Sequence, residues 1–490
     1  MRLSLIALAL GSLGSLAACA DDILDSDESP ADDSTATLSI GGPGTFCSPR
    51  TDTTIVNGGL ARFAPKAYVD PSTPTTLELY AVTTSGVSAR RFYNKSWHSW
   101  RSYGYNASVV PAPGPTAGVG SNGWDAAVTV LPGASGKRDL YFGFWSGSSG
   151  GVARDSIDLT PSGVGTMTGI SPSLGYMSTV TGAAPGGSES VFGTALPNSV
   201  LDTSFATLNL PLERIAGTTP SLITQSGTMS PEQIVGPGGA VSLRRNPATD
   251  ATESIYLYAG DMLTEQQDSS GNWKPFLTDI VTMKLGAASW TSLGAPRHDF
   301  QGVPTPGMVA APPFAFGFYW GDPNAGGTAQ LNVFATARDA GSYQYRLFGR
   351  GMSNGNLEPD WTEYGIPPTV GTDESFALTT GMIWWDGARY ASTLRENLFG
   401  LTAGGKLIEF YWDGGSWQWG QVIANTPDGG TFAALSSAVI DTTGYKRLSL
   451  FVRSSRGTIY EFSYTIDNGV WNGWNWTNLS VLQPCDIYVF

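Results

Sequence analysis

A recurring pattern of short strands constrains this chain more than any other feature, because a repeated unit must stack on its copies to bury a continuous core. Residues 398–417 and 448–474 align with each other. Each reads as an alternating strand, a turn containing glycine, a second alternating strand, and a turn that combines glycine with tryptophan. The same pattern is clear at residues 77–100, 254–294 and 331–365, although the unit at 254–294 carries an insertion.

Two weaker copies, at residues 139–145 and 189–193, have lost the tryptophan turn. Most units follow a strand of small and apolar residues, such as residues 314–318, which suits crowding around a central axis. Successive units start at least about 50 residues apart, enough for four strands and their loops. We therefore predict an all-β fold, a seven-bladed β-propeller of four-stranded antiparallel blades over residues 46–490, with a three-stranded prism or an open sandwich as alternatives.

The composition supports strands and turns and excludes several classes of function. The chain has 62 Gly, 31 Pro and 16 Trp, and no stretch shows a long helical periodicity. Its net charge of −14 argues against a nucleic-acid partner, which needs a basic face. The two histidines, His98 and His298, are far apart in sequence, which argues against a zinc site or a Ser-His-Asp triad. We predict no catalytic residue, metal or cofactor.

The N-terminus has the order of a secretory signal over residues 1–18. Arg2 is followed by an apolar run that is too short to cross a bilayer. The sequence Leu16-Ala17-Ala18-Cys19 resembles the cleavage box of bacterial lipoproteins. That resemblance implies that Cys19 is acylated and holds the protein in the bacterial cell envelope, on the outer membrane or the cell surface. The alternative is an ordinary signal peptide with an incidental cysteine.

An acidic segment follows the signal at residues 19–45, and its carboxylates and few apolar residues are typical of a solvated tether. A calcium loop is the alternative, although the glycine and the oxygen spacing of such loops are missing. With Cys19 used by the anchor, Cys47 and Cys485 remain from three cysteines and are predicted to form a disulfide. It would join the two ends of the fold and contribute about 4 to 5 kcal/mol in the chain-entropy picture.

The repeat units resemble the blades of sugar-binding β-propeller lectins, especially the seven-bladed bacterial fucose-binding type and the related fungal fucose lectins. Residues 331–365, 406–420 and 458–474 carry the resemblance. It implies a non-catalytic protein whose sugars lie in pockets between adjacent blades, held by an aromatic face together with arginine and acidic or amide partners. This chemistry suits saccharides, because C–H faces stack on aromatic rings while charged groups bind vicinal hydroxyls.

The resemblance assigns candidate sugar-binding residues on two blades. They share equal spacing, with an arginine fourteen residues before a glutamate and a tryptophan after it, and are Arg395, Glu409, Trp417, Arg447, Glu461 and Trp471. Asn397 and Ser449 stand where the family has its arginine, a departure from the fucose-binding pattern. The alternative is that the glutamates are solvated strand residues. The tryptophans, including Trp97 and Trp100, would then be packing wedges.

We predict a carbohydrate-binding, lipid-anchored surface lectin without catalysis, and fucosylated glycans are among its candidate ligands. One alternative is an envelope scaffold that binds a protein partner, which the weaker blades and a predicted loop at residues 296–328 fit. Another is a glycoside hydrolase that uses carboxylates alone. No sialidase-like box is visible, and no loop outside the tether concentrates acidic residues.

Overall fold

The structure is a computed structural model, and it describes part of the chain. The described residues are 65–69, 73–82, 86–98, 100–104, 110–111, 129–132, 138–146, 149–157, 166–171, 182–183, 189–194, 212–216, 219–222, 238–246, 251–267, 273–284, 287, 290–300, 303–309, 313–322, 325–339, 344–388 and 392–480. The predicted signal and tether lie outside them, as do Cys19, Cys47 and Cys485. Nothing helical in the described part has the length and hydrophobicity of a membrane span.

The elements of the described residues are β-strands in antiparallel sheets. The first sheet contains β1 (Lys66–Val69), β2 (Leu77–Val82), β3 (Gly86–Tyr93), β4 (Ser96–Trp97) and β5 (Arg101–Gly104). The second contains β6 (Val110–Pro111), β7 (Thr129–Pro132), β8 (Arg138–Ser146), β9 (Ser149–Ile157) and β10 (Thr166–Ser171). The third contains β11 (Gly182–Ala183), β12 (Glu189–Thr194), β13 (Leu212–Ala216) and β14 (Thr219–Leu222).

The fourth sheet is larger than the others and has 11 strands. Its earlier strands are β15 (Gly238–Asn246), β16 (Ala251–Gln267), β17 (Trp273–Lys284), β18 (Thr291–Ser292), β19 (Arg297–Phe300) and β20 (Val303–Val309). Its later strands are β21 (Phe314–Trp320), β22 (Thr328–Asp339), β23 (Tyr345–Ser353), β24 (Asn356–Leu357) and β25 (Thr362–Gly365).

The last two sheets are four-stranded meanders, in which each strand pairs with the strand that follows it. One contains β26 (Phe376–Trp385), β27 (Leu394–Thr402), β28 (Leu407–Trp412) and β29 (Trp417–Ile423). The other contains β30 (Phe432–Thr442), β31 (Tyr445–Ser454), β32 (Ile459–Asp467) and β33 (Val470–Asn478). These are the two units whose repeat is clearest in the sequence.

Two sequence expectations fall on the fourth sheet. The insertion expected in the unit at residues 254–294 lies within the long strands β16 and β17, which pair from Tyr256 with Lys284 to Gln267 with Trp273. The loop expected at residues 296–328 contains β19, β20 and β21. Because β20 pairs with both β17 and β22, it joins two repeat units into one sheet.

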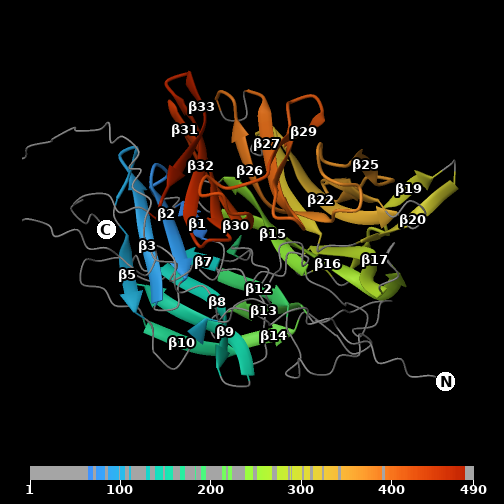
Figure 1. Cartoon of the computed structure of the whole chain (residues 1–490), viewed down its shortest axis with the longest axis horizontal. Coiled ribbons are helices and arrows are strands. Elements are labelled where there is room, and N and C mark those ends of the chain that lie inside the picture. Colours follow the sequence, from blue (N-terminus) through green and yellow to red (C-terminus); the bar gives the residue numbers. More distant parts are fainter. Residues whose placement is uncertain are drawn as a thin grey trace, which may run out of the picture.

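The sheets contact one another in a closed sequence (Figure 1). Strand β11 lies against β15, β15 against β21, β21 against β26, and β26 against β30. The last sheet contacts the first, because β30 lies against β1. The first sheet contacts the second through β1 and β7, and the second contacts the third through β10 and β14. The described residues thus form a ring, in which the first sheet packs on the last.

Hydrophobic side chains between neighbouring sheets hold this ring together. One cluster joins the first and last sheets and includes Phe92, Trp97 and Phe451. A second cluster joins the last two sheets through residues such as Phe399 and Phe462. With a further cluster between the fourth sheet and the β26–β29 sheet, the last two sheets are apolar on both faces, and this explains why their strands read as runs of large hydrophobic residues.

Local turn chemistry sets the register of the last hairpin. Asn468 and Gly469 have φ values of 49° and 81° between β32 and β33, the left-handed conformation that two-residue hairpin turns require. This Asn-Gly turn fixes the pairing of Asp467 with Val470, and hence which residues of β33 face the neighbouring sheet.

Candidate functional site

A cavity of about 410 Å³ lies between the last two sheets of the ring. Its walls come from every strand of the first of these sheets and from three strands of the second. The lining residues are Trp384, Asn397, Phe399, Leu407, Glu409, Tyr411, Gly420, Gln421, Ile423, Leu448, Phe462, Tyr464 and Trp474. Its volume falls in the range typical of small-molecule sites, which combine apolar walls with a few polar groups.

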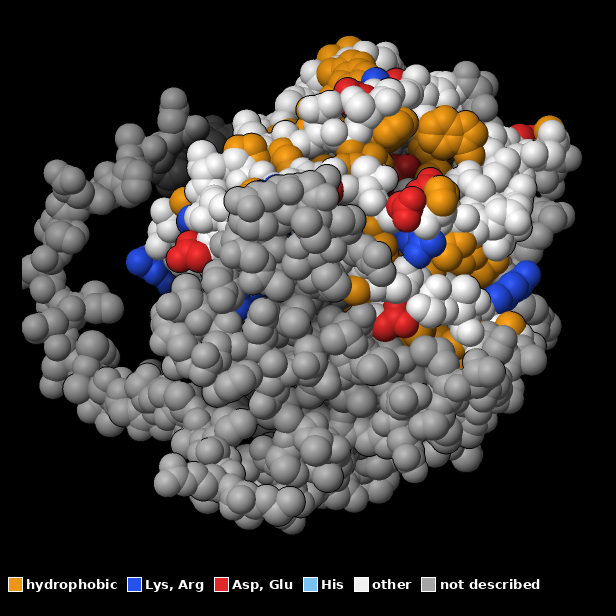
Figure 2. Space-filling model, turned by 90° about the vertical axis from the view of Figure 1, so that its right-hand side faces the viewer, with side chains coloured by type: hydrophobic (Ala, Val, Ile, Leu, Met, Phe, Trp, Pro, Cys, Tyr) orange, Lys and Arg blue, Asp and Glu red, His pale blue; other side chains and the backbone are white. Residues whose placement is uncertain are grey.

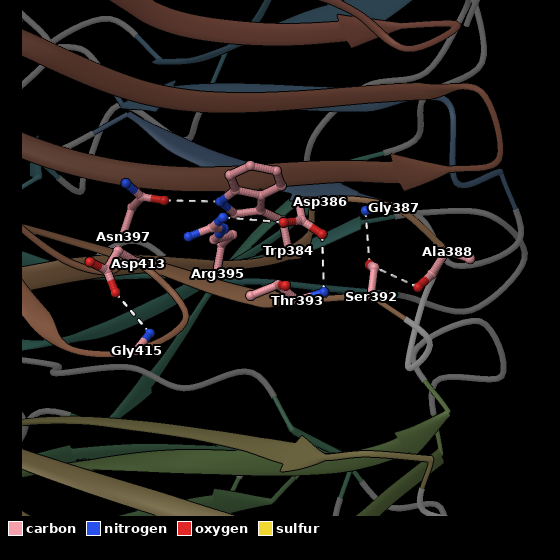
Figure 3. A network of polar contacts seen from close by, with 10 residues as sticks. All are labelled: Trp384, Asp386, Gly387, Ala388, Ser392, Thr393, Arg395, Asn397, Asp413 and Gly415. Atoms are coloured by element: carbon pink, nitrogen blue, oxygen red, sulfur yellow. Dashed lines mark hydrogen bonds and ion pairs between the residues drawn. The ribbon is translucent and has the colours of Figure 1, made fainter.

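The polar part of the cavity is a short chain of hydrogen bonds. The indole Nε1 of Trp384 donates to Oδ1 of Asn397 over 2.9 Å, and Figure 3 shows these two side chains facing each other. Asn397 Nδ2 in turn donates to Oε1 of Glu409 over 2.9 Å. Because the amide is held from both sides, its orientation is fixed, and it orients the carboxylate.

Glycine at position 420 makes room for this carboxylate. A Cβ atom built on Gly420 would lie 2.4 Å from Oε2 of Glu409, closer than such atoms can approach. Strand β29 is also irregular here, because the register between β28 and β29 shifts between Ile408 and Phe410. The bulge and the glycine together allow Glu409 to lie against the strand, where the backbone amide of Gln421 also donates to it.

The electrostatics of the cavity are those of a carboxylate without a counter-ion. Burial raises the pKa of the Glu409 carboxyl, and the hydrogen bonds from Asn397 and Gln421 offset only part of that effect. The lining contains no lysine, arginine or histidine. Glu409 therefore keeps acceptor capacity that is directed to the cavity rather than to a basic side chain.

The opposite side of the cavity is aromatic. The ring centroid of Tyr464 lies 6.2 Å from that of Trp384 and 5.5 Å from that of Trp474. Trp474 is fixed by stacking on Phe462 at 4.6 Å. Trp471 is 54% exposed and contacts both Trp384 and Tyr464 at the edge of this group.

The repeat places a second glutamate at the equivalent position of the last sheet. Glu409 pairs with Phe399 across the sheet, and Glu461 pairs with Phe451. Glu461 is 0% exposed and accepts two hydrogen bonds from Arg447, of 2.8 and 2.6 Å. Ser449 and the indole of Trp97 donate to the same carboxylate, over 2.6 and 2.7 Å. The predicted residues Arg447 and Glu461 therefore meet, and Trp97 joins them from the first sheet at its boundary with the last sheet.

The other predicted pair, Arg395 and Glu409, does not meet. Nη2 of Arg395 instead contacts Oδ2 of Asp386 over 3.2 Å (Figure 3). Asn397, which replaces the family's arginine, contacts Glu409 in its place. The difference between the two sheets follows from the turn before β27, where Asp386 offers Arg395 a partner.

The two predicted tryptophans lie at different kinds of position. Trp417 stacks on Phe410 at 4.8 Å with an interplanar angle of 7°, on the face directed to the preceding sheet. Its equivalent on the last sheet is Trp474 rather than Trp471, because Trp474 stacks on Phe462 in the same manner. Trp471 comes earlier in β33, next to the longer hairpin.

Sequence reasoning missed the residues that complete the cavity. Trp384 and Tyr464 were not among the candidates, and Asn397 was noted only as a departure from the family pattern. The sequence did hold a signal for Trp384. This residue belongs to a pair of adjacent tryptophans that ends β26, and β26 pairs with the strand that carries Asn397.

The charges on the described surface and the absence of clustered metal ligands among the described residues limit the kinds of ligand that this part of the chain can bind. In the view of Figure 2, the described surface shows hydrophobic side chains with isolated acidic and basic ones and no continuous basic face. Among the described residues, no group of three or more His, Cys, Asp or Glu side chains could hold a metal ion.

Comparisons with known proteins find likeness in structure alone. The BP39L lectin from Burkholderia pseudomallei aligns with 13% identity and a TM-score of 0.48, over 84% of this chain and 98% of the lectin. The fucose-recognising fungal lectin of Aleuria aurantia, a six-bladed β-propeller, aligns with 14% identity and a TM-score of 0.36, over 70% of this chain and 91% of the lectin. Drosophila semaphorin 1b, extracellular domains 1–2, aligns with 7% identity and a TM-score of 0.39, over 83% and 85%. No protein-family description and no curated protein matches the sequence.

Proposed function

We propose that this chain is a carbohydrate-binding protein, a lectin whose sugar occupies the cavity between the β26–β29 and β30–β33 sheets. The observation that carries the proposal is the opposition of aromatic rings to a half-buried carboxylate and its amide partner in one cavity of about 410 Å³. Aromatic faces bind the C–H surface of a sugar ring, and Glu409 and Gln421 supply polar groups for its hydroxyls.

Binding without catalysis is favoured by the number of carboxylates. Glycoside hydrolases generally place two carboxylates on either side of the scissile bond. Among the residues that line the cavity, Glu409 is the one acid. Its hydrogen bonds to Asn397 and Gln421 also fix it as an acceptor, which suits recognition.

The number of blades, the disulfide and the lipid anchor are also proposals. Six described sheets, one of which joins two repeat units through β20, support a ring of seven blades. We further propose that Cys47 and Cys485 form a disulfide and that acylated Cys19 anchors the protein in the bacterial envelope, as the N-terminal sequence indicates. Such a lectin would present its pocket to glycans outside the cell, and fucosylated glycans remain among the candidates.

Titration of the soluble body against a broad panel of saccharides tests the proposal directly. The variant Tyr464→Ala removes one aromatic wall and is expected to lower the affinity of any bound sugar by about tenfold or more. Tyr364→Ala is the matched control, because Tyr364 is also a half-buried tyrosine but packs at the preceding boundary, against Phe410. No binding to any saccharide would refute the proposal, and equal loss in both variants would place the sugar elsewhere.

A further inference from the structure

The two equivalent glutamates of the last two sheets have opposite electrostatic environments. Glu461 is saturated, because Arg447 contacts both of its oxygens and Ser449 and Trp97 add further donors. At Glu409 the arginine of the same strand position, Arg395, is directed to Asp386 and does not line the cavity. Glu409 therefore faces the cavity without the guanidinium partner that Glu461 has at the next boundary.

The carboxylate of Glu409 is not otherwise neutralised. Its described partners are the side-chain amide of Asn397 and the backbone amide of Gln421, both of which are neutral donors. An ionised carboxylate offers about four acceptor positions, so at least one remains for a ligand. A partly buried carboxylate gains most from a partner that carries a positive charge, because the hydrogen bond is then charge-assisted.

The aromatic walls favour the same kind of ligand. The rings of Tyr464 and Trp474 line the cavity from the sheet that faces the carboxylate, and Trp384 lies next to Tyr464 on the carboxylate's own sheet, with centroid separations of 6.2 Å from Trp384 to Tyr464 and 5.5 Å from Tyr464 to Trp474. Aromatic faces carry a negative quadrupole and attract cations, and the attraction strengthens when the cation is desolvated. Aromatic rings combined with one carboxylate make a site for an ammonium group.

We propose that the pocket selects a saccharide that carries a protonated amine, an amino sugar whose ammonium group contacts Glu409 as the guanidinium of Arg447 contacts Glu461. This inference rests on the proposed carbohydrate-binding function and names the class of sugar. A saccharide with a carboxylate is disfavoured in the same pocket, because its charge would meet Glu409 with no basic side chain to offset the repulsion.

Two matched sets of sugars test the inference. Short glucosamine oligosaccharides and their N-acetylated counterparts have the same backbone and differ in the charge at one nitrogen. We expect isothermal titration at about pH 6, where the amine is charged, to show at least about tenfold tighter binding of the free amines. An equal or higher affinity for the acetylated or a neutral sugar would overturn the inference and leave the proposed lectin function intact. No binding of any saccharide would refute both.

Variants assign the preference to one carboxylate. Glu409→Gln keeps the size of the side chain but removes its charge, so the ratio of the affinities for the amine and the acetylated sugar should fall to within about twofold. Glu396→Gln is the control, because Glu396 is a buried glutamate of the same sheet that does not line the cavity. A preference that survives Glu409→Gln would overturn the inference, and thermal unfolding of each variant shows whether it is folded.

Discussion

Glu396 provides a quantitative test of the packing between sheets. Its side chain on β27 is 2% exposed, and Oε2 has no hydrogen-bond partner among the described residues. Nε1 of Trp412, the residue paired with Glu396 across the sheet, also lacks one. Burial raises the pKa of this carboxyl from 4.5 to about 8. The folded protein therefore holds a proton on Glu396 at a pH where the unfolded chain has released it.

The consequence is a pH dependence of stability with a definite sign. Because the folded state binds more protons, its free energy of unfolding decreases as the pH rises from the unfolded pKa to the folded one. The shift from 4.5 to about 8, at about 1.4 kcal/mol for each pKa unit, gives a loss of about 5 kcal/mol once the group is fully ionised. Between about pH 5 and pH 9 the loss is about 4 kcal/mol.

The variant Glu396→Gln should remove this loss, because glutamine has the size of the protonated acid and does not ionise. Urea unfolding of both proteins across that pH range measures it, and we expect the variant to gain about 4 kcal/mol over the wild type between the two ends. The control is Glu374→Gln, which removes a carboxylate whose pKa is lowered despite partial burial by hydrogen bonds from Thr402 and Lys406, and which should bring no such gain. If the free energies of unfolding of the wild type and of Glu396→Gln change with pH in parallel, the inference that Glu396 is buried in its protonated form is wrong.

Three further predictions concern the cavity and the ring. Gly420→Ala should lower sugar affinity by about tenfold or more, because its Cβ would displace the Glu409 carboxylate; titration with a bound sugar measures this, and unchanged affinity would contradict it. Arg447→Met should lower the free energy of unfolding, measured in urea, by about 3 to 5 kcal/mol, because it leaves Glu461 buried without its cation. A decrease of less than about 1 kcal/mol would show that the ion pair is solvated. Trp471→Ala should change stability by less than about 0.5 kcal/mol yet weaken sugar binding, as paired unfolding and binding measurements would show; an unaltered affinity would separate Trp471 from the site.

The strands and their pairing could be read from the sequence because they depend on local patterns. Alternating residues and glycine turns at residues 398–417 and 448–474 define β27 to β29 and β31 to β33, and they place Glu409 and Glu461 at matching positions. The antiparallel all-β fold follows from the same signals. The seven-blade count, the disulfide and the lipid anchor stay predictions.

The candidate site could be predicted only in part, because it depends on contacts between sheets. Glu409 lies in the cavity, but its partner is Asn397, since a single aspartate in a turn draws Arg395 away. The spacing of the repeat is the same whichever carboxylate Arg395 contacts, so the sequence alone does not show its partner. The extra length of the last hairpin, set by the turn at residues 468–469, likewise separates Trp471 from the position that Trp417 holds.

The closure of the ring also determines the order in which the molecule can be completed. The carbonyl of Leu479 accepts hydrogen bonds from Nη1 of Arg90 and from the indole of Trp100, over 2.7 and 2.6 Å. Arg90 and Trp100 leave the ribosome long before their acceptor, which follows them by 389 and 379 residues. The first sheet must therefore wait until Leu479 has been synthesised before its interior is sealed, and a chain that stops short of this residue would leave that sheet exposed to chaperones and proteases.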